Sequence, residues 1–198
     1  MRKLVFILII SCFSIQLCFS QNNNQIEDKF LIVLDIQEYH TINKMSETSS
    51  QNFVDSVNYV INNTNPNNVI YVKSNHKVLN ISTSYPFIYV SHDTSAMRLD
   101  NRLNLVNEHI FIKDKSNSFT VEELNLFLKQ NNAKEIVMIG LLAEECIYGS
   151  LIAGKKLGYD MYMIPEAIIG KSQKSKNKTI KKLLKAGINI LDVNELNN

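Results

Sequence analysis

Three side chains of this sequence have the types needed for attack of a thiol on a carbonyl group: Asp35, Lys113 and Cys146. The thiolate is the nucleophilic form of cysteine, and a nearby cation or a helix N-terminus lowers the pKa of the thiol. Lys113 would supply the cation, while Asp35 would take the thiol proton and later activate water. The residue types therefore suggest covalent catalysis through a cysteine, provided that the fold brings the three together.

Each of these residues also has an ordinary structural explanation. A strand-end aspartate such as Asp35 often binds turn amides, and a strand-end lysine such as Lys113 is usually a solvated terminus. A lone cysteine commonly behaves as a small buried hydrophobe, and the cysteine count alone favours that explanation for Cys146. These separate explanations do not predict that all three residues fall at one edge of one sheet.

The placement of the three residues follows from short apolar runs, rich in β-branched residues, that predict strands. The runs are Phe30–Ile36, Val69–Val72, Phe87–Val90, His109–Ile112, Glu135–Ile139, Asp160–Ile164 and Ile188–Leu191. Several are continuously apolar, which predicts strands that are buried on both faces. Asp35 closes the first run, Lys113 closes the fourth, and Cys146 follows the fifth after one short loop.

Helical patterns lie between these runs. Thr120 and Glu123 have the spacing of a capping box, which predicts that one helix starts there. Cys146 begins the helix that runs to Gly158, so its sulfur would feel the positive end of that helix. Strands that alternate with helices predict one α/β domain with a mostly parallel sheet covered on both faces. Ligands bind beyond the carboxyl ends of the strands in such sheets, where the three residues are expected.

The first twenty residues have the features of a signal peptide. Arg2 and Lys3 form a basic start, an apolar run follows, and the small Ser20 precedes a polar stretch. The apolar run is interrupted and shorter than the ~20 residues of a membrane span, so an uncleaved anchor is less favoured. A lipoprotein signal at Cys12 is also less favoured, because its apolar run would be unusually short. We expect export to the periplasm or the medium, with residues 21–198 as the mature domain.

Loss of this segment changes the charge and the cysteine count. Subtracting Arg2 and Lys3 from the 21 basic residues leaves 19, which balance the 19 acidic residues, so neither a basic patch nor nucleic-acid binding is expected. Cys12 and Cys18 also lie in the segment, so Cys146 would be the only cysteine of the mature chain. A leftover thiol in an exported protein is a candidate reactive group.

Three segments together resemble the isochorismatase-like superfamily of cysteine hydrolases. FLIVLDIQ, which contains Asp35, resembles the family's first strand and catalytic aspartate. IFIKDKSNSF resembles its catalytic lysine with a phenylalanine six residues later, and this spacing selects Lys113 over Lys115. GLLAEEC, which ends at Cys146, most resembles the subgroup with a GVVTEVC-like loop before the nucleophile. The similarity extends over residues 29–196, nearly all of the expected mature chain.

The resemblance implies a three-layer Rossmann-like fold with strand order 3-2-1-4-5-6, and hydrolysis through a covalent intermediate on the catalytic cysteine. It also implies a cis peptide at Leu141–Leu142, which turns the backbone N–H groups of Leu142 and Cys146 toward an oxyanion. Gln37, His76 and Phe119 are candidates to line the substrate pocket, although Gln37 could instead hold loops by its amide. Members of the superfamily are often oligomeric, so a homo-oligomer is expected.

One motif of the superfamily is missing. Nicotinamidases carry an Asp-x-His metal motif after the second strand, but the stretch VIYVKSNHK has Ser74 in place of the aspartate. Only His76 remains, and one imidazole does not make a zinc site. We therefore expect a hydrolase without metal or cofactor that cleaves a small amide, imide or related carbonyl substrate.

Two other functions on the same fold stay open. One is a non-catalytic binding or redox-sensing domain, for which reversible oxidation of Cys146 without hydrolysis would be evidence. The other is vinyl-ether hydrolysis of isochorismate, a reaction that does not need the thiol.

Overall fold

The computed structural model describes Ile26, residues 28–193 and Leu196, and the structural statements below concern these residues. The expected signal peptide, residues 1–20, lies outside them. Within the described part of the chain, no helix is long and apolar enough to cross a membrane.

Six parallel strands form one sheet in the order β5-β2-β1-β6-β7-β8. Their bounds are β1 Phe30–Leu34, β2 Val69–Ser74, β5 Ile110–Lys113, β6 Glu135–Leu141, β7 Asp160–Ile169 and β8 Asn189–Ile190. Numbered without the separate β3–β4 pair, the order is 3-2-1-4-5-6, which confirms the predicted fold. The direction of the order reverses between β1 and β6, and the crevice beyond such a reversal is where α/β sheets bind ligands.

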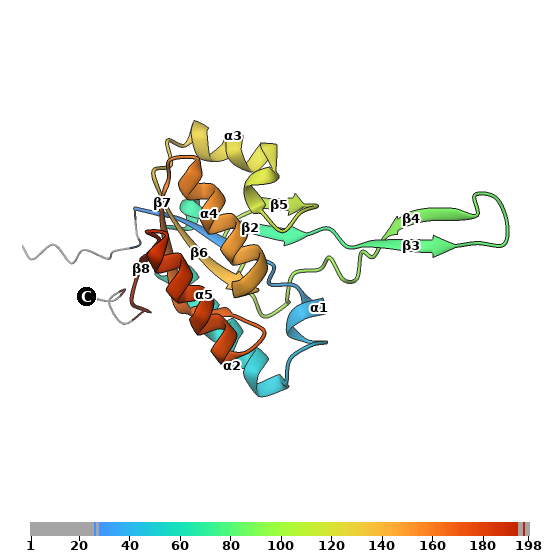
Figure 1. Ribbon diagram of the computed structural model, residues 1–198, viewed down its shortest axis with the longest axis horizontal. Helices are drawn as coiled ribbons and strands as arrows, with labels where there is room; N and C mark the ends of the chain where they lie inside the picture. The colour runs from blue at the N-terminus through green and yellow to red at the C-terminus, as the bar shows by residue number, and fades with distance from the viewer. Residues whose placement is uncertain (1–25, 27, 194–195, 197–198) are drawn as a thin grey trace, which may run out of the picture.

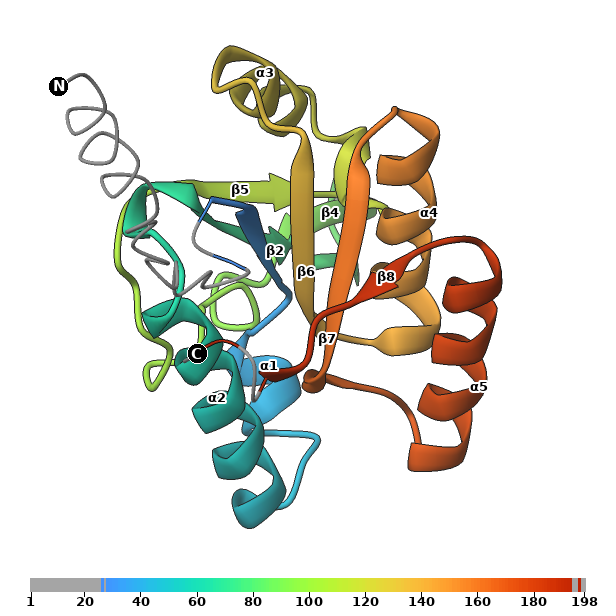
Figure 2. The ribbon, with the colours of Figure 1, turned by 90° about the vertical axis from the view of Figure 1, so that its left-hand side faces the viewer.

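Helices cover both faces of the sheet and complete three layers (Figures 1 and 2). The helix α2 packs on one face, and α3, α4 and α5 pack on the other. The bounds are α1 Glu38–Thr41, α2 Glu47–Asn62, α3 Glu122–Gln130, α4 Tyr148–Lys156 and α5 Gln173–Lys185. Shorter turns precede β2, α3 and α4: η1 Pro66–Asn68, η2 Ser118–Thr120 and the π-helical η3 Ala143–Ile147.

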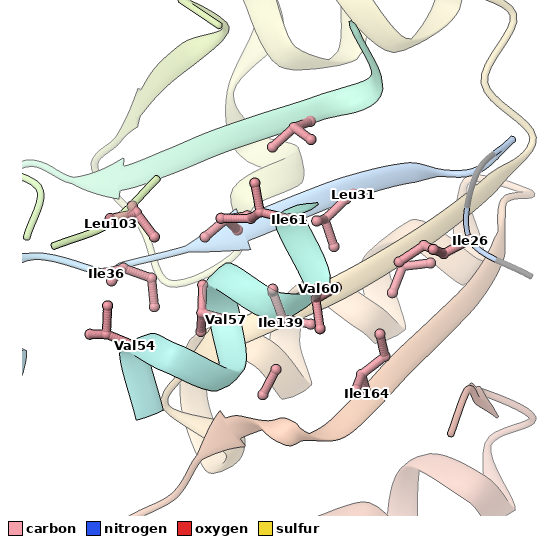
Figure 3. Packing of buried hydrophobic residues seen from close by; sticks show 14 of the residues in the cluster. Ile26, Leu31, Ile36, Val54, Val57, Val60, Ile61, Leu103, Ile139 and Ile164 are labelled. Atoms are coloured by element: carbon pink, nitrogen blue, oxygen red, sulfur yellow. The ribbon is translucent and has the colours of Figure 1, made fainter. Parts of the chain in front are cut away.

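The central strand β1 shows why a continuously apolar run suits this sheet. Leu31 packs in the cluster that contains α2, and its neighbour Ile32 packs in the cluster beneath α3, α4 and α5. Figure 3 shows the first cluster, where Val57 and Val60 of α2 lie near Ile139 of β6. Burying one such side chain contributes ~1.5–3 kcal/mol, so layers on both faces fix the strand at the centre.

One predicted strand lies outside the sheet. The run Phe87–Val90 is predicted to be a buried strand, but Ile88–His92 forms β4, which pairs antiparallel with β3 Lys77–Ile81 alone. The β3–β4 pair extends away from the layers (Figure 1), and its large apolar side chains are exposed. The strand itself is confirmed, but its expected burial in the sheet is wrong, because apolar character shows that a segment needs cover and not which surface supplies the cover.

The predicted capping box before α3 is also wrong. The helix starts at Glu122, its N-cap is Val121, and no side chain caps it. The Thr120 hydroxyl instead donates to the Asn117 carbonyl at 2.7 Å, because residues 118–120 form the 3-10 turn η2. A local side chain–backbone bond has replaced the cap.

Candidate active site

Three neighbouring strands deliver polar side chains to one edge of the sheet. Asp35 directly follows β1, Ser74 ends β2, and Lys113 ends β5. The register pairs Ser74 with Lys113, because β2 continues two residues beyond the predicted run. The fourth contribution, Cys146, comes from the turn η3 after β6, on the other side of β1.

The ammonium group of Lys113 joins these side chains. Its Nζ lies 2.9 Å from Oδ2 of Asp35, donates to Oγ of Ser74 at 2.7 Å, and reaches Sγ of Cys146 at 3.4 Å. Lys113 is only 2% exposed. Since an ammonium has three protons, these three partners use its full donor capacity. The structure thus brings Asp35, Lys113 and Cys146 to one point.

Ser74 is a member of this cluster that the sequence did not identify as one. Its hydroxyl accepts from Lys113 and donates to Oδ1 of Asp35 at 2.7 Å. The two oxygens of Asp35 are therefore held separately, one by Lys113 and one by Ser74. In the sequence, Ser74 stood out only as a lost metal ligand. The sequence signal that could have identified the role of Ser74 is a hydroxyl residue near the end of a predicted strand.

The backbone of Asp35 adopts a left-handed conformation, with φ of 61°. Aspartate tolerates this region better than most residues, but the conformation still costs on the order of 1 kcal/mol or more. Hydrogen bonds on both sides hold it: the Asp35 N–H donates to the Val72 carbonyl, and the Gln37 N–H donates to the Asp35 carbonyl, each at 2.8 Å. The strained backbone is therefore that of the same aspartate whose carboxylate lies in the cluster.

Cys146 lies in the first helical turn after β6, but it does not begin the helix as predicted. The turn η3 starts at Ala143 and is π-helical, with the Ile147 N–H bonded to the Leu142 carbonyl at 3.2 Å. The peptide bond between Leu141 and Leu142 is cis. In the described chain, the Leu142 N–H forms no hydrogen bond, so it is available to a ligand.

The predicted direction of the Cys146 pKa shift is wrong. Burial raises the pKa of the thiol from 9.0 to about 11, and the Asp35 carboxylate raises the pKa further than Lys113 can lower it. The sequence prediction counted the cation and the helix end but not the loss of solvent. The thiol is therefore protonated at neutral pH, and a base must remove its proton during attack.

Gln37 is fully buried and acts as a clamp. Its Nε2 donates to the carbonyls of Ser74 at 3.1 Å and Ala96 at 2.8 Å, and its Oε1 accepts from the Ser74 N–H at 2.8 Å. The amide thus ties the end of β2 to the segment that returns from β4. This is the loop-holding role and not a pocket lining.

Aromatic and imidazole rings lie beside the cluster. The Tyr39 ring is 4.4 Å from the His76 ring and 5.2 Å from the His40 ring, between centroids. Burial lowers the pKa of His40, an effect opposed by the Asp35 carboxylate and aided by the Lys113 ammonium. The pKa of His40 therefore depends on both charges of the cluster. In the sequence, the stretch Glu38–His40 stood out only as a departure from the family. His76, a candidate pocket residue, packs on Tyr39 and is not among the residues that line the hollow next to that ring.

A hollow of about 290 Å³ opens next to these rings. It is lined by Glu38, Tyr39, Ile42, Asn43, Asp93, Ser95, Ala96 and Arg98. A larger hollow, about 650 Å³, lies on α5 and is lined by Asn177 and five lysines: Lys174, Lys178, Lys181, Lys182 and Lys185. These lysines form a local basic patch that the balanced total charge did not predict. A single helix forms that hollow, so we place the chemistry at the strand ends.

Phe119 lies in the hydrophobic core instead of an open pocket. It is 6% exposed, and its ring stacks on Tyr159 at 5.7 Å between centroids. A Cβ at Gly154 of α4 would come within 2.8 Å of the Phe119 ring. The glycine therefore lets α4 approach the turn η2, and Phe119 supports the helix that follows Cys146.

The described residues do not fit the zinc site of nicotinamidases. No group of three His, Cys, Asp or Glu side chains in the described chain could hold a metal ion. The Ser74 hydroxyl is engaged by Lys113 and Asp35, and the His76 ring packs on Tyr39. We therefore derive no chemical step through a metal.

Comparison with known proteins gives the family. A family model of the isochorismatase domain matches residues 29–195. The chain belongs to the isochorismatase family of hydrolases. This membership confirms the resemblance carried by the three sequence segments. A comparison with curated proteins gives no match.

Solved structures with this fold share little sequence with this isochorismatase-family chain. The zinc complex of Pyrococcus horikoshii pyrazinamidase is 18% identical with a TM-score of 0.65, over 83% of this chain and 98% of that chain. An isochorismatase family protein from Desulfovibrio vulgaris is 13% identical with a TM-score of 0.67, over 86% and 96%. The YcaC gene product of Escherichia coli, described as an octameric hydrolase of unknown specificity, is 14% identical with a TM-score of 0.64, over 85% and 77%.

Proposed function

We propose that this hydrolase cleaves a small amide, imide or related carbonyl substrate through Cys146 and without a metal. The observation that carries the proposal is the buried Lys113 ammonium, which contacts Asp35, Ser74 and Cys146 together. A base, a cation and a thiol within hydrogen-bonding reach of one another are the groups that nucleophilic catalysis requires.

In the first half of the reaction, the sulfur of Cys146 attacks the substrate carbonyl carbon while Asp35 accepts the thiol proton. The backbone N–H groups of Leu142 and Cys146 donate to the oxygen that becomes negative, and Lys113 stabilises the developing charge. Collapse of this adduct breaks the carbon–nitrogen bond. The proton on Asp35 passes to the leaving nitrogen, which leaves a thioester on Cys146.

In the second half, water hydrolyses the thioester. Asp35 takes a proton from water as the water oxygen attacks the thioester carbon. The carbon–sulfur bond then breaks, and the proton returns from Asp35 to the sulfur. The products are a carboxylic acid and the resting thiol, so no oxidant and no co-reactant other than water is needed.

The raised pKa of Cys146 favours hydrolysis over redox sensing. Sensor cysteines are oxidised as thiolates and are characterised by a low pKa and an accessible sulfur. The Cys146 pKa of about 11 leaves little thiolate at neutral pH, but a thiol that is deprotonated only during attack suits Asp35 as base.

The substrate class follows from the rings near the cluster and from solved neighbours. Tyr39, His40 and His76 offer stacking surfaces and hydrogen-bonding groups beside Asp35. Three solved neighbours are named as pyrazinamidase or nicotinamidase. Both observations favour a small, flat amide or imide.

The test is a panel of small amides and imides, with ammonia release as the readout. We expect turnover that Cys146→Ala abolishes, and an acylated Cys146 in the intact mass after rapid quenching. Tyr148→Phe, two residues away and partly exposed, serves as the control and keeps its activity. Full amide turnover by Cys146→Ala would contradict the proposal, and its activity on isochorismate would favour vinyl-ether hydrolysis.

We propose two further properties of the whole protein. Export through residues 1–20 predicts that protein from the periplasm or medium begins near Gln21, and an intact Met1 there would contradict it. Self-association is proposed from the oligomeric state described for YcaC. Neither property depends on the chemistry above.

A further inference from the structure

The β3–β4 arm, residues 77–92, is a two-stranded ribbon that pairs with no other strand of the described chain. Its register pairs Leu79 with Val90 and Ile81 with Ile88. Directly paired residues of antiparallel strands lie on the same face, so these four side chains form one apolar face. The opposite face carries Val78, Asn80, Tyr89 and Ser91, with Asn80 bonded to the Ser91 hydroxyl at 2.7 Å.

The apolar face is open. Leu79, Ile81, Ile88 and Val90 are 67%, 84%, 63% and 58% exposed. Figure 1 shows the arm reaching well beyond the helices. An isolated two-stranded ribbon is at best marginally stable in water, so a covering surface is expected.

The apolar face supplies about half of the exposed apolar area of the arm. Eight large apolar side chains of the arm are between 41% and 88% exposed. With roughly 200 Å² for each side chain, the eight present on the order of 1,000 Å², of which the four side chains of the apolar face supply on the order of 500 Å². Patches of about 300–600 Å² are the largest on an ordinary monomer and are often functional. A standard interface buries ~800 Å² of each partner, so the apolar face would supply more than half of one side and its surroundings the rest.

Charge identifies the occupant. Residues 78–91 contain no Asp, Glu, Lys or Arg. At a twofold interface a residue on the axis faces its own copy, so the centre of the interface must be free of like charges. Segments that lie on a lipid surface instead carry Lys or Arg on their polar face, and residues 78–91 contain neither.

We propose that the apolar face of the β3–β4 arm is the surface on which a second copy of this chain docks. The inference rests on the self-association proposed above and is independent of the proposed chemistry. The free outer edges of β3 and β4 add backbone groups that can pair with those of another copy.

The arm also begins and ends at the candidate active site. Ser74 lies three residues before β3, and Ala96 lies four residues after β4. Gln37 binds both through its side-chain amide. Docking on the arm therefore holds the two segments that carry the Ser74 hydroxyl and border the hollow next to Tyr39.

The experiment is sedimentation velocity on the purified protein from about 1 to 100 µM. The test variant is Ile81→Ser/Ile88→Ser, with Leu79→Ser/Val90→Ser as a second removal of the same face. The control is Val78→Ser/Tyr89→Ser, which removes apolar groups from the opposite face. We expect the wild type and the control to self-associate, and both apolar-face variants to bind themselves at least ~100-fold more weakly. Thermal melts check that each variant is folded.

Three outcomes overturn the inference. If the wild type stays monomeric over the whole range, self-association and the docking surface both fail. If the apolar-face variants associate like the wild type, only the surface fails. If the monomeric wild type binds phosphatidylcholine or phosphatidylglycerol vesicles through this face, lipid is the occupant. In none of these cases does the amide-panel result change, so the proposed chemistry is judged separately.

Discussion

The catalytic cluster and the β3–β4 arm are joined through Ser74, but they differ in what completes them. At the cluster, each proton of Lys113 has an acceptor from the same chain, and the carboxylate of Asp35 is bound on both oxygens. On the arm, the four side chains of the apolar face are more than half exposed in the described chain. We infer that one chain builds the chemistry, whereas a second copy completes the arm.

The largest effect on turnover is expected at the cluster, from Asp35→Asn. We expect turnover to fall by about 10³-fold, because the base is lost. The same change removes a negative charge that raises the Cys146 pKa, so alkylation of Cys146 by iodoacetamide at pH 8 should become faster. Asp55→Asn on the exposed face of α2 is the control and changes neither rate. Slower alkylation in Asp35→Asn would contradict the arrangement described here.

The next largest effect separates the two regions by how much each contributes to the free energy of unfolding. Gly140 has φ of 120°, and a Cβ there would collide with the Leu34 carbonyl oxygen. We expect Gly140→Ala to lower the free energy of unfolding by about 3 kcal/mol or more. For the exposed Ile88→Ser we expect at most ~0.5 kcal/mol in the monomer. Urea unfolding at low protein concentration measures both, and equal losses would remove the distinction.

A third substitution tests the anchor of the segment that returns from the arm. Asp100 accepts from the Thr41 hydroxyl at 2.5 Å and pairs with Arg102 at 2.6 Å. Burial opposes ionisation, but hydrogen bonds from Arg102 and Thr41 hold the Asp100 pKa below its usual value. A depressed pKa stabilises the fold above the unfolded pKa, and this stabilisation is lost as pH falls through the folded pKa.

We therefore expect Asp100→Asn to cost about 2 kcal/mol at pH 7, with a smaller difference from wild type near pH 3. Urea unfolding at the two pH values checks the sign. A difference that is equal at both values would show that the charge of Asp100 does not contribute.

The smallest effect is expected from a matched pair of serines. Ser74→Ala removes the hydroxyl that holds Asp35 and should lower kcat about 10-fold with little change in KM. Ser91→Ala removes the bond from Asn80 on the arm and should leave kcat of the enzyme unchanged. Equal effects of the two substitutions would mean that Ser74 has no special role in positioning Asp35.

The sheet was predictable because its strands are apolar on both faces and end in residues of distinctive chemistry. Asp35 and Lys113 could be placed at one edge for that reason, and the structure finds them 2.9 Å apart. The contribution of Ser74 was not predictable, since it depends on the exact register between β2 and β5. The pKa of Cys146 needed the burial of its sulfur, which a sequence does not contain.

The predicted burial of the β4 segment is wrong for a different reason. Phe87–Val90 has the same apolar character as Val69–Val72, but β2 has a strand on each side and β4 has only one. Composition records how much apolar surface a segment has. Which neighbour covers that surface depends on contacts between distant parts of the chain or between chains.

The side-chain amide of Gln37 has a thermodynamic consequence. It binds the backbone of Ser74 and of Ala96, so the hydroxyl that holds the catalytic carboxylate and the root of the arm share one anchor. Two binding events that act on one anchor are linked, and linkage is reciprocal. If docking of a second copy changes substrate affinity by some factor, substrate must change the dimerisation constant by the same factor. Substrate concentration would then set the assembly state of this enzyme.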